Sequence, residues 1–122
     1  MARDQKSNSE LAADEVQRSV SALAVETRQL THPSDTAALL ARLRGVQSTL
    51  SEVYSELAAW HERQDATTTT GTHGDPEAPI RVRAEVALRE AAQYGVDASA
   101  ALERARSAQQ VELWFDELKV DE

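Results

Sequence analysis

The sequence contains no cysteine, and this absence excludes disulfides, thiolate catalysis and zinc sites built on cysteine. Aromatic residues make up only 4% of the 122 residues, so any core must be built mainly from aliphatic and small side chains. No apolar run approaches the length of a membrane-spanning helix, and the first residues lack the apolar stretch of a signal peptide. We therefore expect a cytoplasmic protein with no membrane partner.

The balance of charge is strongly acidic. The chain has 21 acidic residues against 13 lysines and arginines, which gives a formal net charge of −8. This excess disfavours general attraction to nucleic acid or to an anionic membrane. Arg81, Arg83 and Arg89 do form a cluster. However, Glu85 and Glu90 are interspersed with them, as on a solvated helix face.

Alanine is abundant, with 21 residues, and it has the highest helix propensity and lets helix axes approach closely. Residues 1–7 are polar, and we expect them to be frayed. The spacing of apolar and small residues then predicts a first helix, which Pro33 ends. The stripe that predicts this helix consists of Ala13, Val16, Val20, Leu23, Thr27 and Leu30.

The best-marked element is a long amphipathic helix from Ser34 to Gln64. Its apolar residues recur in steps of four and three over three heptads. The short break at Pro33 predicts that residues 8–64 form an antiparallel helical hairpin. Gly45 lies beside the stripe, where we expect a neighbouring helix to approach closely. The stripe serves either packing within the hairpin or contact between chains, and consists of Leu39, Leu43, Val46, Leu50, Val53, Leu57 and Trp60.

Residues 65–78 are rich in threonine, glycine and proline and are predicted to be a flexible linker. A second helical hairpin is expected over residues 79–118, followed by an acidic tail at 119–122. Its first helix is predicted to end at Tyr94, because Gly95 suits the position after a helix, and its second to begin at Asp97. Small residues dominate its stripes, which are Ile80, Ala84, Ala87, Ala91 and Tyr94, then Ala98, Ala101, Ala105 and Ala108, then Val111, Trp114 and Leu118.

These elements predict one all-α domain, an antiparallel four-helix bundle made of two helical hairpins with a long second helix. In an up-down-up-down bundle, Trp60 and Trp114 would lie at the same end. The second helix is longer than the predicted third, so part of its apolar stripe would protrude and need cover. A homodimer is the simplest cover.

Carboxylates on the second helix are the first candidates for chemistry. Glu52 and Glu56 are four residues apart, and Glu62 and Asp65 follow. The pattern resembles that of the all-α nucleotide pyrophosphohydrolases, which hold Mg²⁺ with helix carboxylates, and residues 95–102 resemble the start of their C-terminal helix. The resemblance implies a metal-dependent nucleotide hydrolase. Because the adjacent acidic pair of that family is missing here, we assign no catalytic, metal or cofactor-binding residue.

Other catalytic patterns are absent from the sequence. The histidines His32, His61 and His73 have no metal-binding spacing, and the glycines of residues 71–74 lack the lysine of a phosphate-binding loop. No nucleophile elbow occurs. We therefore expect a protein that is not an enzyme and has no cofactor.

The segment from Val111 to Leu118 alternates bulky apolar residues with carboxylates, as acidic docking helices do. The same side chains could instead close the end of a bundle. The candidate partner-binding residues are Tyr54, Trp60, Val111, Trp114, Phe115 and Leu118.

The sequence favours a non-catalytic interaction, adaptor or regulatory protein that self-associates and binds another protein. The first alternative is the metal-dependent nucleotide hydrolase. The second is a DNA-linked regulator with a helix-turn-helix across residues 94–97, in which Arg104 and Arg106 would face DNA. The alanine-, arginine- and glutamate-rich composition also resembles that of small helical proteins from high-GC bacteria.

Overall fold

The first helix, α1, spans Asn8–Thr27 in a computed structural model that describes residues 5–68 and 78–120. Ser7 caps it, since the Ser7 hydroxyl accepts a hydrogen bond from the backbone N–H of Glu10 at 3.2 Å. At the other end, the backbone N–H of Arg28 bonds the carbonyls of Val25 and Glu26. The predicted stripe is present on α1, but Val16 and Val20 are about half exposed. The chain divides into two compact units, Met1–Thr36 and Ala37–Glu122.

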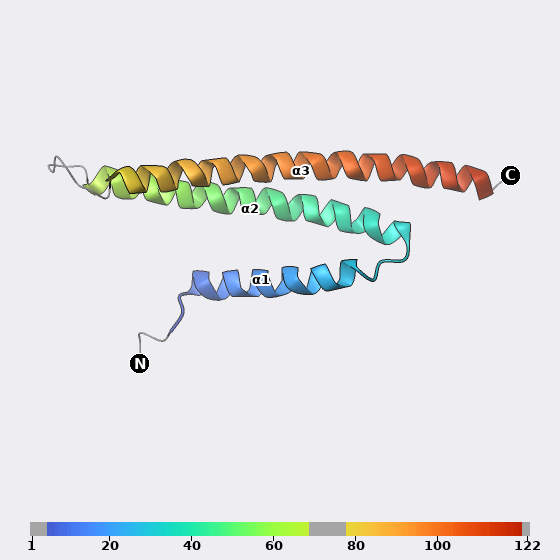
Figure 1. Cartoon of the computed structure of the whole chain (residues 1–122), viewed down its shortest axis with the longest axis horizontal. Coiled ribbons are helices and arrows are strands. Elements are labelled where there is room, and N and C mark those ends of the chain that lie inside the picture. The colour runs from blue at the N-terminus through green and yellow to red at the C-terminus, as the bar shows by residue number, and fades with distance from the viewer. Residues whose placement is uncertain (1–4, 69–77, 121–122) are drawn as a thin grey trace. The chain divides into compact units, whose positions relative to one another are not determined.

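Two longer helices make up most of the second unit. Helix α2 spans Pro33–Thr68 and α3 spans Ala78–Val120 (Figure 1). Ion pairs join Glu62 to Arg89 at 2.9 Å and Arg44 to Glu103 at 3.0 Å. Residue numbers fall on α2 as they rise on α3, so the two helices run antiparallel as a hairpin.

The interface between α2 and α3 follows a heptad spacing on both helices. Its centre is made of small residues: Ser51 and Ala58 on α2, and Ala92 and Gly95 on α3, are buried. The facing positions on α2 are Ala37, Leu40, Arg44, Gln47, Ser51, Tyr54, Ala58 and His61. Those on α3 are Glu85, Leu88, Ala92, Gly95, Ser99, Leu102, Arg106, Gln109 and Leu113.

The prediction of an all-helical chain is confirmed for the described residues, which include no strand. The four-helix bundle is not confirmed, because the described residues form three helices. The break predicted at Tyr94 and Gly95 is wrong, since α3 is continuous through both. At Gly95, α3 passes close to α2: a Cβ atom there would lie 3.0 Å from Cβ of Ser51. The helix needs a glycine at this position for close packing rather than for a turn.

The expected linker, residues 65–78, is divided by the boundaries of the helices. Residues 65–68 continue α2 and Ala78 begins α3, while residues 69–77 lie outside the described residues. The predicted close approach at Gly45 is also wrong. A Cβ atom at Gly45 would meet nothing within 4 Å, because this residue points away from α3.

The two tryptophans lie at opposite ends of the hairpin, contrary to the prediction. Trp60 is beside the pair of Glu62 and Arg89, whereas Trp114 lies well beyond Glu103 on α3. At 1.5 Å per residue along α3, the separation is roughly 40 Å. A continuous α3 carries Trp114 away from the end at which α2 finishes.

Candidate functional site

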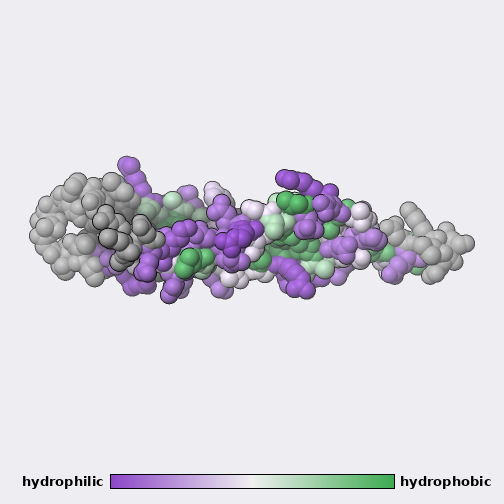
Figure 2. Space-filling model, turned by 90° about the horizontal axis from the view of Figure 1, so that it is seen from below, coloured by the Kyte–Doolittle hydropathy of each residue, from purple (hydrophilic) through white to green (hydrophobic). Residues whose placement is uncertain are grey.

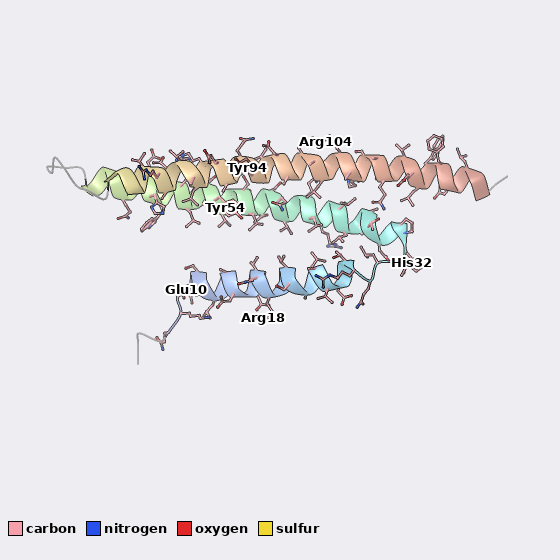
Figure 3. All side chains as sticks on the ribbon, viewed as in Figure 1. Glu10, Arg18, His32, Tyr54, Tyr94 and Arg104 are labelled. Carbon is pink, nitrogen blue, oxygen red and sulfur yellow. The ribbon has the colours of Figure 1, made fainter. Side chains whose placement is uncertain are left out.

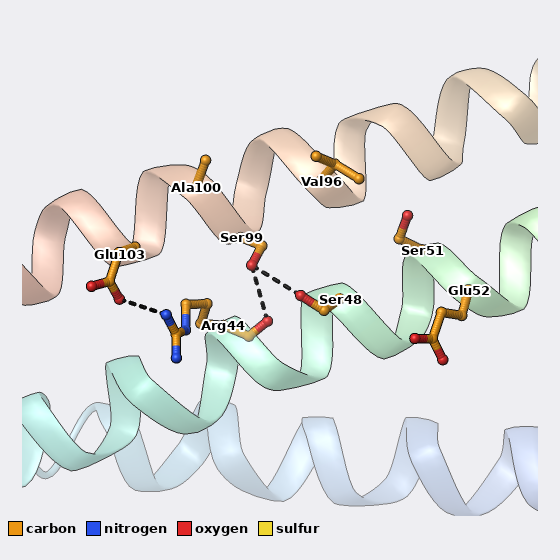
Figure 4. Close-up of a pocket in the computed structure, with 8 residues that line it drawn as sticks. All are labelled: Arg44, Ser48, Ser51, Glu52, Val96, Ser99, Ala100 and Glu103. Atoms are coloured by element: carbon orange, nitrogen blue, oxygen red, sulfur yellow. Dashed lines mark hydrogen bonds and ion pairs between the residues drawn. The ribbon is translucent and has the colours of Figure 1, made fainter.

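The contacts between α2 and α3 are polar at several points. The Ser51 hydroxyl donates a hydrogen bond of 2.6 Å to the carbonyl of Ala92. Ser99 lies 3.1 Å from the Ser48 hydroxyl and donates to the carbonyl of Arg44 at 3.3 Å (Figure 4). Small hydroxyl side chains therefore join the two backbones directly, which requires the helices to be close.

A shallow groove runs along this part of the hairpin, with the ion pair of Arg44 and Glu103 at one end (Figure 4). Glu103 also accepts two hydrogen bonds from Arg106, at 2.9 and 3.0 Å. The bond from Arg106, with the charges of Arg106 and Arg44, lowers the pKa of the Glu103 carboxyl below its ordinary value. Arg44 and Glu103 are thus engaged with each other and with Arg106, whereas Glu52 has no ion pair among the described residues. Its lining residues are Arg44, Ser48, Ser51, Glu52, Val96, Ser99, Ala100 and Glu103.

The predicted α2 stripe is not the face that α3 covers. Each position of that stripe lies one residue before a position that faces α3, and one residue is about 100° around the helix. Val46, Val53, Leu57 and Trp60 are accordingly 41–49% exposed, while Leu39, Leu43 and Leu50 are partly buried. Large apolar side chains are left uncovered, and smaller and more polar ones pack against α3.

The same displacement occurs on α3. The predicted alanine stripe lies one residue before the positions that face α2, and its Tyr94 is 69% exposed (Figure 3). Because the helices are antiparallel, the same rotation on each turns both stripes to the same side of the hairpin. We call this side the hairpin face. It consists of Leu39, Leu43, Val46, Leu50, Val53, Leu57 and Trp60 on α2, and of Ala84, Ala87, Ala91, Tyr94, Ala98, Ala101, Ala105 and Ala108 on α3.

The candidate partner-binding residues are not brought together. Tyr54 is partly buried against α3 (Figure 3), and Trp60 lies on the hairpin face with its ring edge-on to His61, the centroids 5.0 Å apart. At the other end of the hairpin, Trp114 and Phe115 are in edge contact at 5.1 Å. We call the exposed residues of this end the C-terminal cluster, namely Val111, Trp114, Phe115 and Leu118.

Apolar side chains reach the surface at several places in this molecule. Figure 2 shows hydrophobic residues interrupting an otherwise hydrophilic face. In the C-terminal cluster the four side chains are 45–56% exposed. The described residues include no fully buried large side chain. Many of the large apolar side chains in the described residues are therefore half exposed and available for contact.

The acidic side chains of the hydrolase alternative that the structure describes, Glu52, Glu56 and Glu62, are not gathered into a metal site. Glu62 is engaged by Arg89, which also pairs with Glu85 at 3.3 Å. Over residues 5–68 and 78–120, no three histidine or acidic side chains are placed to hold a metal ion. His61 does not complete a metal site either. Its Nδ1 atom is buried in the hairpin and has no hydrogen-bond partner among the described residues.

One of the two arginines that would face DNA in the helix-turn-helix alternative is also held in an ion pair. Arg106 is paired with Glu103, while Arg104 is exposed on α3 (Figure 3). A helix-turn-helix would need a turn across residues 94–97, where α3 is instead continuous. The separate recognition helix of that motif, predicted to begin at Asp97, is therefore not formed.

The interface residues themselves were missed by the sequence reasoning. Ser51, Ser99 and Gly95 are neither large nor apolar, so a search for bulky heptads passes over them. The signal that could have found them is a second set of heptad-spaced residues, one position later on each helix, whose central members Ser51, Ala58, Ala92 and Gly95 are small.

No described helix has a stretch long and apolar enough to cross a lipid bilayer. Comparison with protein-family models, with curated proteins and with solved structures found no match.

Proposed function

We propose that this chain is a non-catalytic helical interaction protein, with an adaptor or regulatory role, that binds other helices through uncovered apolar surfaces. The observation that carries the proposal is the displacement of the α2 stripe from the α3 interface. Of the seven large side chains in this stripe, Val46, Val53, Leu57 and Trp60 are 41–49% exposed, so α3 leaves much of the stripe uncovered. The cytoplasmic location expected from the sequence remains part of this proposal.

The physical argument is the cost of leaving such a surface in water. Burying apolar area contributes about 25 cal/mol per Å², so a stripe of leucine, valine and tryptophan favours any partner that covers it. A helix whose own apolar residues recur every three or four positions fits such a stripe. The hairpin face therefore suits a helical partner rather than a small molecule.

The C-terminal cluster is a second surface, separated from Trp60 by most of the hairpin. Trp114 and Phe115 together form a half-exposed aromatic pair. Tryptophan is a frequent anchor of protein interfaces. An adaptor requires two contact points that can be occupied at once. Trp60 and Trp114 are far enough apart for that, although Val111 directly continues the α3 stripe of the hairpin face.

The test is affinity capture from native lysate with the tagged full chain, comparing the wild type with Trp114→Ala and Glu112→Ala. Glu112 is exposed in the same segment and serves as the matched control. We expect a partner that is retained by Glu112→Ala and reduced at least about tenfold by Trp114→Ala. Recovery of nothing but the chain itself, across a range of salt concentrations, would refute a heterologous partner.

A further inference from the structure

We propose that the occupant of the hairpin face is a second copy of this chain, related by a twofold axis that passes beside Ser48 and Ser99, so that two hairpins form one antiparallel four-helix bundle. This inference rests on the proposed function and names the partner of the hairpin face. It is argued from the geometry of the face, from the charges that flank it and from the match between its two stripes.

The geometry of the face fits a four-helix arrangement. On each helix, the direction to the other helix and the direction of the uncovered stripe differ by one residue, or about 100°. Four parallel or antiparallel helices at the corners of a square need contact directions about 90° apart. Stacking one hairpin face on another therefore places α2 beside the second α2 and α3 beside the second α3.

The charged residues that flank the α2 stripe favour one alignment of the two copies of α2. Beside the α2 stripe, on the side away from α3, lie Arg42, Thr49, Glu56 and Arg63, all exposed. In an antiparallel pair of helices these flanking positions meet their own counterparts. An axis near Ser48 brings Arg42 opposite Glu56 of the second copy, twice by symmetry. Shifting the pairing by one heptad would instead place Arg42 opposite the second copy's Arg63, and two cations would repel.

Neither Arg42 nor Glu56 has an ion pair within the described part of the chain. Other charges of the hairpin are satisfied internally, as with Arg44 and Arg89. The two groups that this alignment joins are thus among the charged side chains that the described part of the hairpin leaves without an ion pair.

The same axis arranges the apolar layers well. On α2, the opposed pairs are Leu39 with Leu57, Leu43 with Val53 and Val46 with Leu50. Every layer between residues 39 and 57 is then apolar, over about 27 Å of helix. Trp60 lies outside these layers, at the edge of the bundle.

The α3 stripe is compatible with this axis, because a repeat of alanines can match itself in more than one register. The alanine stripe matches itself about a point between Ala98 and Ala101. This match pairs Tyr94 with Ala105, a large side chain with a small one, and Ala91 with Ala108. The residue at that point is Ser99, and its hydroxyl lies 3.1 Å from that of Ser48. The charges of α2 therefore select the level of the axis, and the α3 stripe accepts an axis at that level.

The first test is the mass of the full chain by sedimentation equilibrium. We expect a dimer for the wild type and at least about 100-fold weaker association for Val53→Glu, which would put two carboxylates into the apolar layers. Ala41→Glu is the matched control, because Ala41 is exposed on α2 outside the hairpin face. It should leave the dissociation constant within about threefold of the wild type.

The second test is a charge exchange. Arg42→Glu and Glu56→Arg should each weaken the dimer roughly tenfold, since each replaces two attractive pairs by two repulsive ones. The double variant restores opposite charges and should return to within about threefold of the wild type. Additive loss in the double variant would overturn the alignment.

The third test uses the absence of cysteine from the chain. Thr49→Cys should oxidise to a disulfide-linked dimer, because the two copies of residue 49 meet across the axis. Leu57→Cys should not, since its two copies would lie roughly 27 Å apart along the bundle. Cross-linking by Leu57→Cys alone would indicate parallel helices and overturn the proposal.

A monomeric wild type at every concentration would also overturn it. Residues 8–27 of the same chain, or another protein, would then be the occupant of the hairpin face. Partner capture through Trp114 is measured separately. Loss of the dimer with capture retained would leave the proposed function standing, whereas loss of both would remove the two together.

Discussion

Two glycines in the middle of long helices show how much a single residue depends on its surroundings. Gly95 is buried where α3 crosses α2, within reach of Ser51 and of the Gln47 carbonyl. Gly45 is exposed, with open space where a side chain would be. The same residue type therefore permits close packing at one position and only lowers helix stability at the other.

The first prediction concerns these two positions. Gly45→Ala should raise the free energy of unfolding by about 0.5–1 kcal/mol, because alanine favours the helix and meets no neighbour. Gly95→Ala should lower it by roughly 1–2 kcal/mol, because its Cβ would lie 3.0 Å from Cβ of Ser51 and 3.3 Å from the Gln47 oxygen. Urea unfolding followed by circular dichroism measures both, and equal effects of the two substitutions would contradict the packing described.

The second prediction concerns Glu103, whose pKa in the folded chain lies below its ordinary value of 4.5 because Arg106 and Arg44 favour the carboxylate. Its contribution to stability is therefore fully present above pH 4.5 and is lost as the pH falls through the folded pKa. Glu103→Gln should melt at a lower temperature than the wild type at pH 7, and the difference should shrink below pH 4.5. A difference that stayed constant over this range would show that the carboxylate charge is not responsible.

At the scale of the element, α2 carries two stripes of heptad-spaced residues, and each position of one stripe lies one residue after a position of the other. One heptad contains small and polar residues such as Ser51 and Ala58 and faces α3; the other contains large ones such as Val53 and Leu57. Close approach of the helices favours the small heptad, because small side chains let serine hydroxyls reach the opposite backbone. The large heptad would hold the axes further apart and forfeit those bonds.

The third prediction concerns the continuity of α3. Carbon-13 secondary shifts should remain helical through residues 94–97, and the amides there should exchange slowly because Gly95 is packed against α2. The control is the same measurement on residues 98–102, which lie in the same helix. Random-coil shifts confined to residues 94–97 would restore the four-helix division of the chain.

At the scale of the whole molecule, the described residues have too little internal core for their apolar content. The buried apolar side chains are Ala58 and Ala92, whereas Val46, Val53 and Leu57 are more than 40% exposed. Such a chain gains stability from whatever covers it. Its stability should then depend on protein concentration, because the dimer adds binding energy to folding energy.

The fourth prediction follows from that dependence. The melting temperature of the wild type should rise by a few degrees over a hundredfold increase in concentration, whereas Val53→Glu should show no such rise. Ala41→Glu, with the same added charge outside the hairpin face, should behave as the wild type does. Differential scanning calorimetry gives these values, and a wild-type melting temperature independent of concentration would contradict a dimer held by this face.

The candidate surfaces could be predicted in part. The exposed residues Trp60 and Trp114 belong to the stripe of large residues on α2 and to the C-terminal segment, which the sequence had marked as candidate binding surfaces. Their arrangement could not be predicted. The bundle end that was expected to gather both tryptophans depended on a turn at Gly95, and a glycine after a tyrosine looks the same in sequence whether it ends a helix or lies under a crossing helix.

The sequence by itself determined the helical class, the break before α2 and the heptad spacing, because periodicity and helix propensity are properties of local chain segments. Only the tertiary structure decided which of two adjacent heptads faces the neighbouring helix. That choice depends on how closely two backbones can approach, and hence on the small residues Ser51, Ala92 and Gly95 from distant parts of the chain. The large heptad was visible in the sequence, but its exposure was not.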